Sequence, residues 1–262
     1  MNARSDKITA AEAKAIIIKK FNSNVRGKIP NLAGINTKHA GKEGHWLETQ
    51  MGIDHNNKNE PDLLGYEMKN QTKGKTTFGD WSADYYIFKS TGNKKSKITK
   101  DDFLSVFGKK NLKKKDRFSW SGEPVPNIKT YNKFGQKLKI DRSNNILAVY
   151  SFEKDCRLDK KNIVPAAFQE NEIILAKWNK ESIKKKLEDK FNKFGWFKCL
   201  KNKENKYTEI VFGKTVNFEL WIGLVKLGIV FFDSGMYQGN SRNYSQWRAS
   251  NAFWDQLIFE RY

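Results

Sequence analysis

Apolar residues recur along the chain at two spacings, one typical of helices and the other of strands. A first helix is predicted after Thr9, which has capping-box spacing to Glu12 and precedes a run rich in Ala, Ile and Lys. A basic amphipathic helix is predicted over residues 179–194, with three apolar residues on one stripe: Ile183, Leu187 and Phe191. Short helices are expected over residues 45–52 and 247–259.

Strands are predicted where β-branched and aromatic residues alternate or cluster. One piece ends near Asp62 and the next covers residues 66–70. Leu64 and Gly65 between them predict a tight reversal, in which glycine is available for a positive φ. Further strands are expected at residues 78–88, 146–152, 207–212, 216–222 and 225–232.

The net charge narrows the choice of partners. The chain has 49 Lys and Arg against 29 Asp and Glu, a formal net charge of +20. Cationic side chains release the counterions condensed on a polyanion, so nucleic acid is the leading partner. Solubility alone, or attraction to an anionic membrane surface, are the alternatives.

Other compositional features indicate the setting of the protein. No stretch approaches the roughly 20 apolar residues of a membrane span, and no signal peptide is recognisable. Only two cysteines are present, Cys156 and Cys199, which argues against a disulfide framework and a cysteine-ligated zinc site. The histidines His39, His45 and His55 lack metal-ligand spacing. A cytoplasmic protein is expected.

Residues 92–117 concentrate positive charge, with ten Lys or Arg among them. The segment also contains apolar residues, among them Ile98, Phe103 and Phe107, which indicate that it folds rather than trailing as a tail. Two interpretations stay open at this point: a solvated basic face, or a surface that follows the phosphates of a nucleic acid.

The most informative stretch runs from residue 60 to residue 69. Glu67 and Lys69 share one face of the predicted strand, while Met68 points into the core. Asp62, before the reversal, is expected to lie across from Glu67. Two close carboxylates repel unless a cation compensates them, and Mg²⁺ prefers oxygen ligands.

This arrangement predicts a magnesium site held by Asp62, Glu67 and the carbonyl of Met68, in which Mn²⁺ could substitute. Lys69 is the candidate catalytic lysine, placed to hold or deprotonate the attacking water and to neutralise charge in the transition state. Glu48, on the predicted short helix, could orient a water, bind a second metal or set the charge of Lys69.

Several blocks of sequence resemble the PD-(D/E)xK nucleases. They are Gly44-His-Trp-Leu-Glu48, Met51-Gly-Ile53, Pro61-Asp62, Glu67-Met-Lys69, and, near the C-terminus, Phe232-Asp-Ser-Gly-Met-Tyr237 with Tyr244-Ser-Gln-Trp-Arg248. Within these nucleases the chain looks most like the MutH-like branch, in the MvaI/BcnI group of type II restriction endonucleases with its LlaMI and ScrFI relatives.

The resemblance implies an α/β (α+β) fold, with a mixed sheet flanked by helices and two lobes around a DNA cleft. It implies metal binding by Asp62 and Glu67, a catalytic Lys69 and an upstream Glu48. A catalytic lobe is expected over residues 1–155 and a recognition lobe over 156–262, with a soft boundary that lets the lobes interleave. A bacterial, DNA-associated enzyme is implied, acting as a monomer beside a cognate DNA methyltransferase.

The C-terminal block supplies candidate contacts to DNA. Arg pairs with guanine through two hydrogen bonds, and Asp accepts one from cytosine N4. Asp233, Arg242 and Arg248 are therefore a reading set for G·C pairs, unless the arginines contact phosphates or pair with Asp233 instead. The remaining candidate DNA-binding residues are Lys73, Tyr237, Asn240 and Gln246.

Three functions compete at this stage. The first is a Mg²⁺-dependent type II restriction endonuclease that cuts double-stranded DNA at a short site, with CC-N-GG-type sites favoured and GATC open. The second is a MutH-like nicking repair endonuclease that needs a partner. The third is a basic DNA-binding protein without chemistry.

Overall fold

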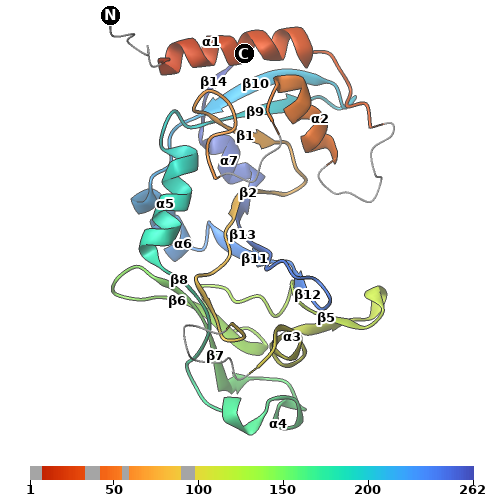
Figure 1. Cartoon of the computed structure of the whole chain (residues 1–262), viewed down its shortest axis with the longest axis vertical. Helices are drawn as coiled ribbons and strands as arrows, with labels where there is room; N and C mark the ends of the chain where they lie inside the picture. The colour runs from red at the N-terminus through yellow and green to blue at the C-terminus, as the bar shows by residue number, and fades with distance from the viewer. Residues whose placement is uncertain (1–7, 33–41, 55–58, 90–97) are drawn as a thin grey trace, which may run out of the picture. The chain divides into compact units, whose positions relative to one another are not determined.

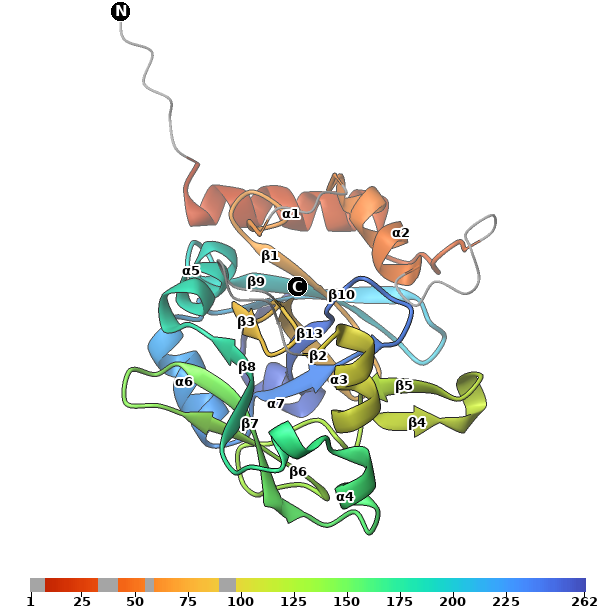
Figure 2. The same ribbon diagram turned by 60° about the horizontal axis from the view of Figure 1, so that its bottom comes forward.

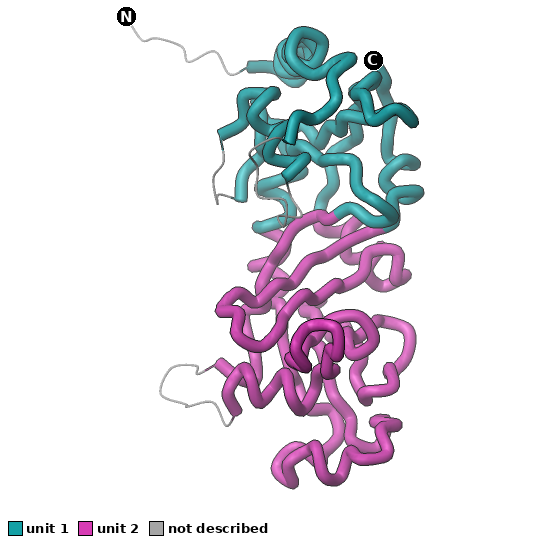
Figure 3. Tube along the Cα trace, turned by 90° about the vertical axis from the view of Figure 1, so that its right-hand side faces the viewer, with its two compact units in different colours: residues 1–76, 186–217, 250–262 teal, residues 77–185, 218–249 magenta. Residues whose placement is uncertain are grey.

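The computed structural model describes residues 8–32, 42–54, 59–89 and 98–262, which fold into two compact units (Figure 3). Unit 1 comprises residues 1–76, 186–217 and 250–262; unit 2 comprises residues 77–185 and 218–249. A single boundary at residue 155 does not describe this division, because each unit draws on residues from both sides of it. The units are interleaved along the chain.

Unit 1 is built on a mixed sheet with the strand order β1-β9-β10-β14. β1 runs parallel to β9, whereas β10 is antiparallel to both β9 and β14. The elements of this unit, shown in Figure 1, are α1 (Ala10–Asn24), α2 (Lys42–Met51), β1 (Glu67–Asn70), β9 (Trp196–Lys201), β10 (Tyr207–Gly213), α7 (Asn251–Gln256) and β14 (Ile258–Arg261).

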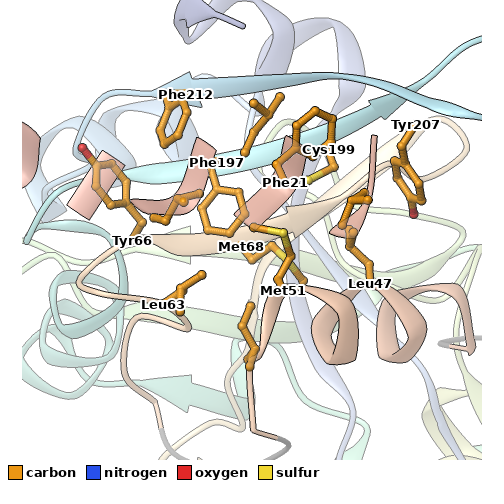
Figure 4. Packing of buried hydrophobic residues seen from close by; sticks show 14 of the residues in the cluster. Phe21, Leu47, Met51, Leu63, Tyr66, Met68, Phe197, Cys199, Tyr207 and Phe212 are labelled. Carbon is orange, nitrogen blue, oxygen red and sulfur yellow. The ribbon is translucent and has the colours of Figure 1, made fainter. Parts of the chain in front are cut away.

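The core of unit 1 lies between one face of this sheet and the helices α1 and α2 (Figure 4). The strands contribute Met68, Phe197 and Phe212 to it. The helices contribute Ile17, Phe21, Leu47 and Met51, each fully buried. Because side chains alternate along a strand, burial of Met68 in this core turns Glu67 and Lys69 to the other face, as predicted.

A tight turn leads into β1. Leu63 and Tyr66 exchange backbone hydrogen bonds of 3.0 and 2.9 Å, and the two residues between them have positive φ, 50° at Leu64 and 92° at Gly65. Two left-handed central residues define a type I′ turn, which confirms the predicted reversal. The strand expected before Asp62 is wrong for the described residues 59–62, where Pro61 removes a backbone donor.

Unit 2 contains antiparallel sheets with the orders β3-β8-β7-β6 and β12-β5-β4, and most of a third, β11-β13-β2. Its strands are β2 (Lys75–Asp80), β3 (Tyr85–Tyr86), β4 (Lys109–Asn111), β5 (Arg117–Trp120), β6 (Phe134–Ile140), β7 (Ile146–Asp155), β8 (Ile173–Trp178), β11 (Phe231–Ser234), β12 (Met236–Tyr237) and β13 (Ser245–Ser250).

The helices of unit 2 are α3 (Lys100–Phe107), α4 (Lys160–Ile163) and α6 (Phe218–Lys226), with 3₁₀ turns at Leu112–Lys114 and Ala166–Phe168. α5 (Lys180–Phe191) begins in unit 2 and ends in unit 1. Aromatic rings dominate the core: Trp178 packs edge-on against Phe232 at 4.9 Å and Trp247 at 5.4 Å between ring centroids.

Several predicted elements are confirmed. α1 begins with the expected capping box, since Thr9 accepts from the Glu12 amide at 3.3 Å and Glu12 accepts from the Thr9 amide at 2.8 Å. The helices at 45–52 and 179–194 correspond to α2 and α5, and the strands at 146–152 and 207–212 correspond to β7 and β10.

The two strands predicted between residues 216 and 232 are largely wrong, because α6 occupies most of this stretch. Its buried residues, Phe218, Trp221, Ile222 and Val225, recur at helical spacing, which a nearly continuous apolar run conceals. Only its end, β11, is a strand.

The helix predicted over 247–259 is also wrong at both ends, where β13 and β14 lie. In β13 every second residue is buried, namely Ser245, Trp247 and Ala249, and this period of two is typical of a strand. Ser250 then caps α7 by accepting from the Phe253 amide at 3.2 Å.

Two further observations concern the setting. Over the described ranges, no helix combines the length and apolar character needed to cross a membrane. Both cysteines are free, Cys156 exposed and Cys199 buried.

We expect Gly65→Ala to destabilise the protein by more than Gly74→Ala. Both glycines have positive φ, 92° and 81°, which disfavours alanine by about 1 kcal/mol. A Cβ at Gly65 would also lie 2.7 Å from the Phe194 ring, whereas a Cβ at Gly74 meets no atom within 4 Å. Urea unfolding measures the free energy of unfolding of both variants. We expect that of Gly65→Ala to be lower by about 1–3 kcal/mol, the cost of overpacking. Equal midpoints for the two variants would contradict this reading of the turn.

Candidate active site

The turn and β1 bring three predicted site residues together in unit 1. Asp62 Oδ2 accepts the backbone N–H of Met68 at 2.8 Å, which fixes this carboxylate beside the strand. Lys69 Nζ donates to Glu67 Oε1 at 2.8 Å, as their shared strand face predicts. The chain therefore places two carboxylates and an ammonium in one cluster.

A second lysine joins the cluster from α5. Lys190 Nζ donates to the same oxygen, Glu67 Oε1, at 2.9 Å. Lys190 is not among the residues predicted for the site, although its neighbour Phe191 belongs to the predicted apolar stripe. The helical pattern indicates that Lys190 lies at the edge of the buried face, but it does not indicate which strand that face covers.

The cluster is largely shielded from water. Glu67 is 2 % exposed and Lys69 is 6 % exposed. The ammonium of Lys69 lies over the ring of Phe191, 4.9 Å from its centroid. Trp196, the register partner of Glu67 on β9, packs edge-on against Trp254 at 5.0 Å. Burial, with the Phe191 ring against the Lys69 ammonium, strengthens the electrostatic interactions among the charged groups.

Burial and mutual charge shift the pKa values of the cluster. The pKa of Asp62 is raised to about 7 by burial and by the Glu67 charge, against the opposing effects of Lys190 and Lys69. Burial also disfavours ionised Glu67, but the ammoniums of Lys69 and Lys190 outweigh it and lower the pKa of this carboxyl. Burial lowers the pKa of Lys69, with Lys190 acting in the same direction and Glu67 opposing it.

The two oxygens of Glu67 differ in their contacts. Oε1 receives both lysines, whereas the buried Oε2 makes no hydrogen bond with any residue that the structure describes. A buried carboxylate oxygen without a donor is costly unless a cation or water satisfies it. Together with Asp62 and the carbonyl of Met68, it offers oxygen ligands of the kind that Mg²⁺ prefers.

The donor set is small. Where residues are described, no group of three or more His, Cys, Asp or Glu side chains is placed to hold a metal. Two carboxylates and a carbonyl leave several coordination positions to water, which suits Mg²⁺ better than a cation that demands many protein ligands. The residues therefore fit a magnesium ion.

Glu48 lies on α2, and its charge acts on Lys190 of the cluster. Burial lowers the pKa of Lys190, but the negative charges of Glu67, Asp62 and, to a smaller extent, Glu48 outweigh burial and raise it. His45 Nδ1 lies 3.5 Å from Glu48 Oε2. His39 and His55 lie outside the described residues.

The comparison with protein families decides the identity. A model of the LlaMI restriction endonuclease family matches residues 25–262. The chain belongs to the LlaMI restriction endonuclease family. The match contains the whole cluster, from Glu48 to Lys190.

Individual relatives agree with this assignment. The chain is 48 % identical over 266 residues to the type II restriction enzyme ScrFI of Lactococcus lactis subsp. cremoris, covering 94 % of this chain and 97 % of that enzyme. The solved complex of restriction endonuclease MvaI with its cognate DNA substrate matches with a TM-score of 0.58 at 14 % identity, over 99 % of each chain. This likeness confirms the predicted PD-(D/E)xK fold, and the LlaMI family membership makes the chain a restriction endonuclease.

The predicted DNA-binding residues of this LlaMI-family chain fall mostly in unit 2. Asp233 lies on β11, whereas Gln246 and Arg248 lie on the neighbouring strand β13. Arg248 pairs with Asp233, Nε to Oδ2 at 3.2 Å, and also donates to the Gln246 side chain. The alternative that Arg248 pairs with Asp233 is the one seen in this structure.

The other candidates are distributed around β12. Arg242 pairs with Asp80 at 2.8 Å and lies over the Tyr244 ring, 4.7 Å from its centroid. Asn240 Nδ2 donates to the Tyr237 hydroxyl at 2.6 Å. Lys73 belongs to unit 1, where it is exposed between β1 and β2.

Replacing Lys190 by Met is expected to destabilise the protein by about 1.5–3 kcal/mol near pH 8, the range for a hydrogen bond to a charged group. The lowered pKa of Glu67 adds stability above its unfolded value of about 4.5, and this is lost as the pH falls through the folded value. The difference from wild type should therefore be largest between about pH 8 and 9. It should fall in part as Asp62 is protonated at about pH 7, and shrink further below about pH 4.5.

Urea unfolding across this pH range measures the effect. Lys184→Met on the same helix is the control, because Lys184 makes no ion pair in the part of the chain that the structure describes. A destabilisation that does not change with pH would show that Lys190 acts through packing rather than through its charge.

Proposed function

We propose that this restriction endonuclease hydrolyses phosphodiester bonds of double-stranded DNA in a Mg²⁺-dependent reaction at the Asp62–Glu67–Lys69 cluster. The observation that carries the proposal is the buried, unpartnered Oε2 of Glu67 beside a second carboxylate and a buried lysine. Duplex DNA as the substrate is supported by the net charge of +20 and by the cognate DNA in the matched MvaI complex.

Asp62, Glu67 and the Met68 carbonyl would hold the ion, and Mn²⁺ would serve in its place. When bound, the ion supplies a coordinated water of lowered pKa and positive charge beside the phosphoryl oxygens. Asp62 is held for this role by the Met68 amide, and the two lysines on Glu67 Oε1 leave Oε2 available. These contacts support a ligand set that needs little rearrangement to bind the ion.

Lys69 would orient the attacking water and stabilise the negative charge that develops on the phosphate. Its burial against Phe191 supports this role, because a low-dielectric setting strengthens its interaction with an anion. Lys69 is held in place for this role by its hydrogen bond to Glu67 Oε1. Glu48 would orient a water from α2.

The proposed target is a short site of the CC-N-GG type. Asp233, Arg242 and Arg248 are residues whose side chains match cytosine and guanine. Their ion pairs keep the side chains ordered before DNA binds, and we propose that contacts to bases replace part of these pairs. GATC is the alternative, and sequencing of cleaved ends distinguishes the two.

We further propose that the enzyme acts as a monomer and that a cognate DNA methyltransferase protects the host DNA. A cell that contains an endonuclease for a short site needs its own copies of that site to be modified. Sedimentation of the protein with and without a duplex tests the monomer.

Digestion of a plasmid of known sequence tests the proposed function. With Mg²⁺ we expect discrete fragments whose ends share one short sequence, and with EDTA no cleavage. Asp62→Ala should retain binding to the duplex and lose at least about 100-fold in cleavage rate, the cost of removing one group that stabilises a transition state.

Asp159→Ala is the matched control. Asp159 is exposed and makes no side-chain hydrogen bond at the start of α4, so this variant should cut at the wild-type rate. An Asp62→Ala protein that cuts as fast as the control would eliminate the proposed centre. Slow nicking that a repair protein accelerates would instead support the MutH-like alternative.

A further inference from the structure

The hairpin of β4 and β5 concentrates positive charge on one projection of unit 2. Between residues 109 and 117 it has six cationic side chains and a single acidic one, Asp116: the cationic residues are Lys109, Lys110, Lys113, Lys114, Lys115 and Arg117. Figures 1 and 2 show the hairpin reaching outward from the rest of its unit. Its tip, residues 112–116, is exposed throughout.

The described residues 98–108, which precede the hairpin in the basic stretch 92–117, belong partly to the core. α3 directs Phe103, Leu104 and Phe107 into the core, each fully buried, and begins with a capping box between Thr99 and Asp102. Over the described residues 98–117, the segment is therefore not a uniform solvated face. Its unburied positive charge gathers on the hairpin.

The cationic side chains of the hairpin differ in their ion pairs. Lys109 pairs with Glu123 at 2.6 Å and Lys110 with Asp116 at 3.5 Å. Lys113, Lys114 and Lys115, in contrast, form no ion pair with any residue that the structure describes. Unpaired like charges on adjacent residues repel one another, which makes an anionic partner favourable.

The backbone of the tip is held in a defined shape. Lys115 and Asp116 both have positive φ, 54° and 58°, although neither is glycine. The Asn111 side chain accepts from the Lys113 amide at 3.1 Å and so fixes the start of the 3₁₀ turn. Non-glycine residues in this region carry a conformational cost, and such cost is often found at functional sites.

The hairpin is also joined to the segment that carries predicted DNA contacts. β5 pairs with β12, so that Ser119 lies opposite Tyr237. The Arg117 guanidinium lies 3.7 Å from the centroid of the Tyr237 ring, and its buried Nε has no hydrogen-bond partner within the described chain. Gln238, next to β12, forms two hydrogen bonds with the backbone of Phe118 on β5. Its side-chain oxygen accepts from the Phe118 amide at 2.8 Å, and its own amide donates to the Phe118 carbonyl at 3.0 Å.

We propose that the β4–β5 hairpin is a phosphate-binding arm, in which Lys113, Lys114 and Lys115 contact the backbone of duplex DNA beside the segment that reads its sequence. This inference rests on the proposed function, since it assumes a duplex substrate. Contacts to phosphates add affinity and fix the register of the protein on the duplex, but they carry no sequence information directly. The arm therefore contributes to binding on every sequence alike.

Salt dependence of binding tests the arm. Each lost phosphate contact makes the slope of log K against log salt shallower by about 0.9, so the triple variant Lys113→Gln, Lys114→Gln, Lys115→Gln should lose about 2.7 in slope. Fluorescence anisotropy in EDTA, where no cleavage occurs, measures this on a duplex with the cleaved site and on one without it. We expect the same loss on both duplexes, and an unchanged cleavage site.

A second triple variant provides the control. Lys129, Lys161 and Lys203 are exposed residues that do not belong to the hairpin, and their replacement by Gln removes the same charge. We expect it to change the slope by less than about 1. Circular dichroism of both variants should match the wild type, because every replaced side chain is exposed.

Three results would overturn the proposal. An equal loss of slope in the control would show an effect of net charge alone. An unchanged slope in the hairpin variant would show that the tip does not contact phosphates, and a loss confined to the duplex with the site would show that the tip reads bases. A wild-type chain that binds no duplex at all would instead identify the proposed function as the point of failure.

Discussion

The active cluster depends on the cost of placing Glu67 inside the protein. A carboxylate that is 2 % exposed is unfavourable unless positive charge compensates it. Two ammonium groups, from Lys69 on the same strand and Lys190 on α5, compensate it through a single oxygen. The second oxygen has no hydrogen-bond partner among the described residues, and this unequal use of the two oxygens is the basis of the cation site that we propose.

The fold supplies each part of this arrangement from a different region of the sequence. The I′ turn at Leu64 and Gly65 returns the chain so that Asp62 reaches the Met68 amide. Burial of Met68 in the core between the sheet and the helices α1 and α2 fixes the face on which Glu67 and Lys69 lie. Lys190 comes from a helix 123 residues away in sequence from Glu67, after the chain has passed through unit 2.

Local features of the site could be predicted from sequence, because they depend on spacing along one segment. The i, i+2 relation of Glu67 and Lys69, the glycine in the turn and the capping box of α1 belong to this kind. Lys190 could not be predicted, since sequence does not say which strand α5 covers. Where an apolar run is almost continuous, as in α6, the choice between helix and strand depends on tertiary packing.

The interleaving of the two units also depends on contacts between residues distant in sequence. The predicted boundary near residue 155 separates the N-terminal motifs from the C-terminal ones, whereas β9, β10 and β14 complete the sheet of unit 1 from residues beyond 195. Parallel pairing of β1 with β9 requires a long connection, and here that connection includes much of unit 2. Partners so distant in sequence leave no local signal of their pairing.

In the proposed function, Glu67 Oε2 and Asp62 form the site of a divalent cation. Anomalous diffraction from crystals of the protein soaked in Mn²⁺ tests it most directly, because the ion is located without any reference to activity. We predict a peak within about 2.5 Å of Glu67 Oε2 and of an Asp62 oxygen, the coordination distance of such cations to carboxylates. A strong peak elsewhere in the protein, with none beside Glu67, would show that these carboxylates do not form the cation site.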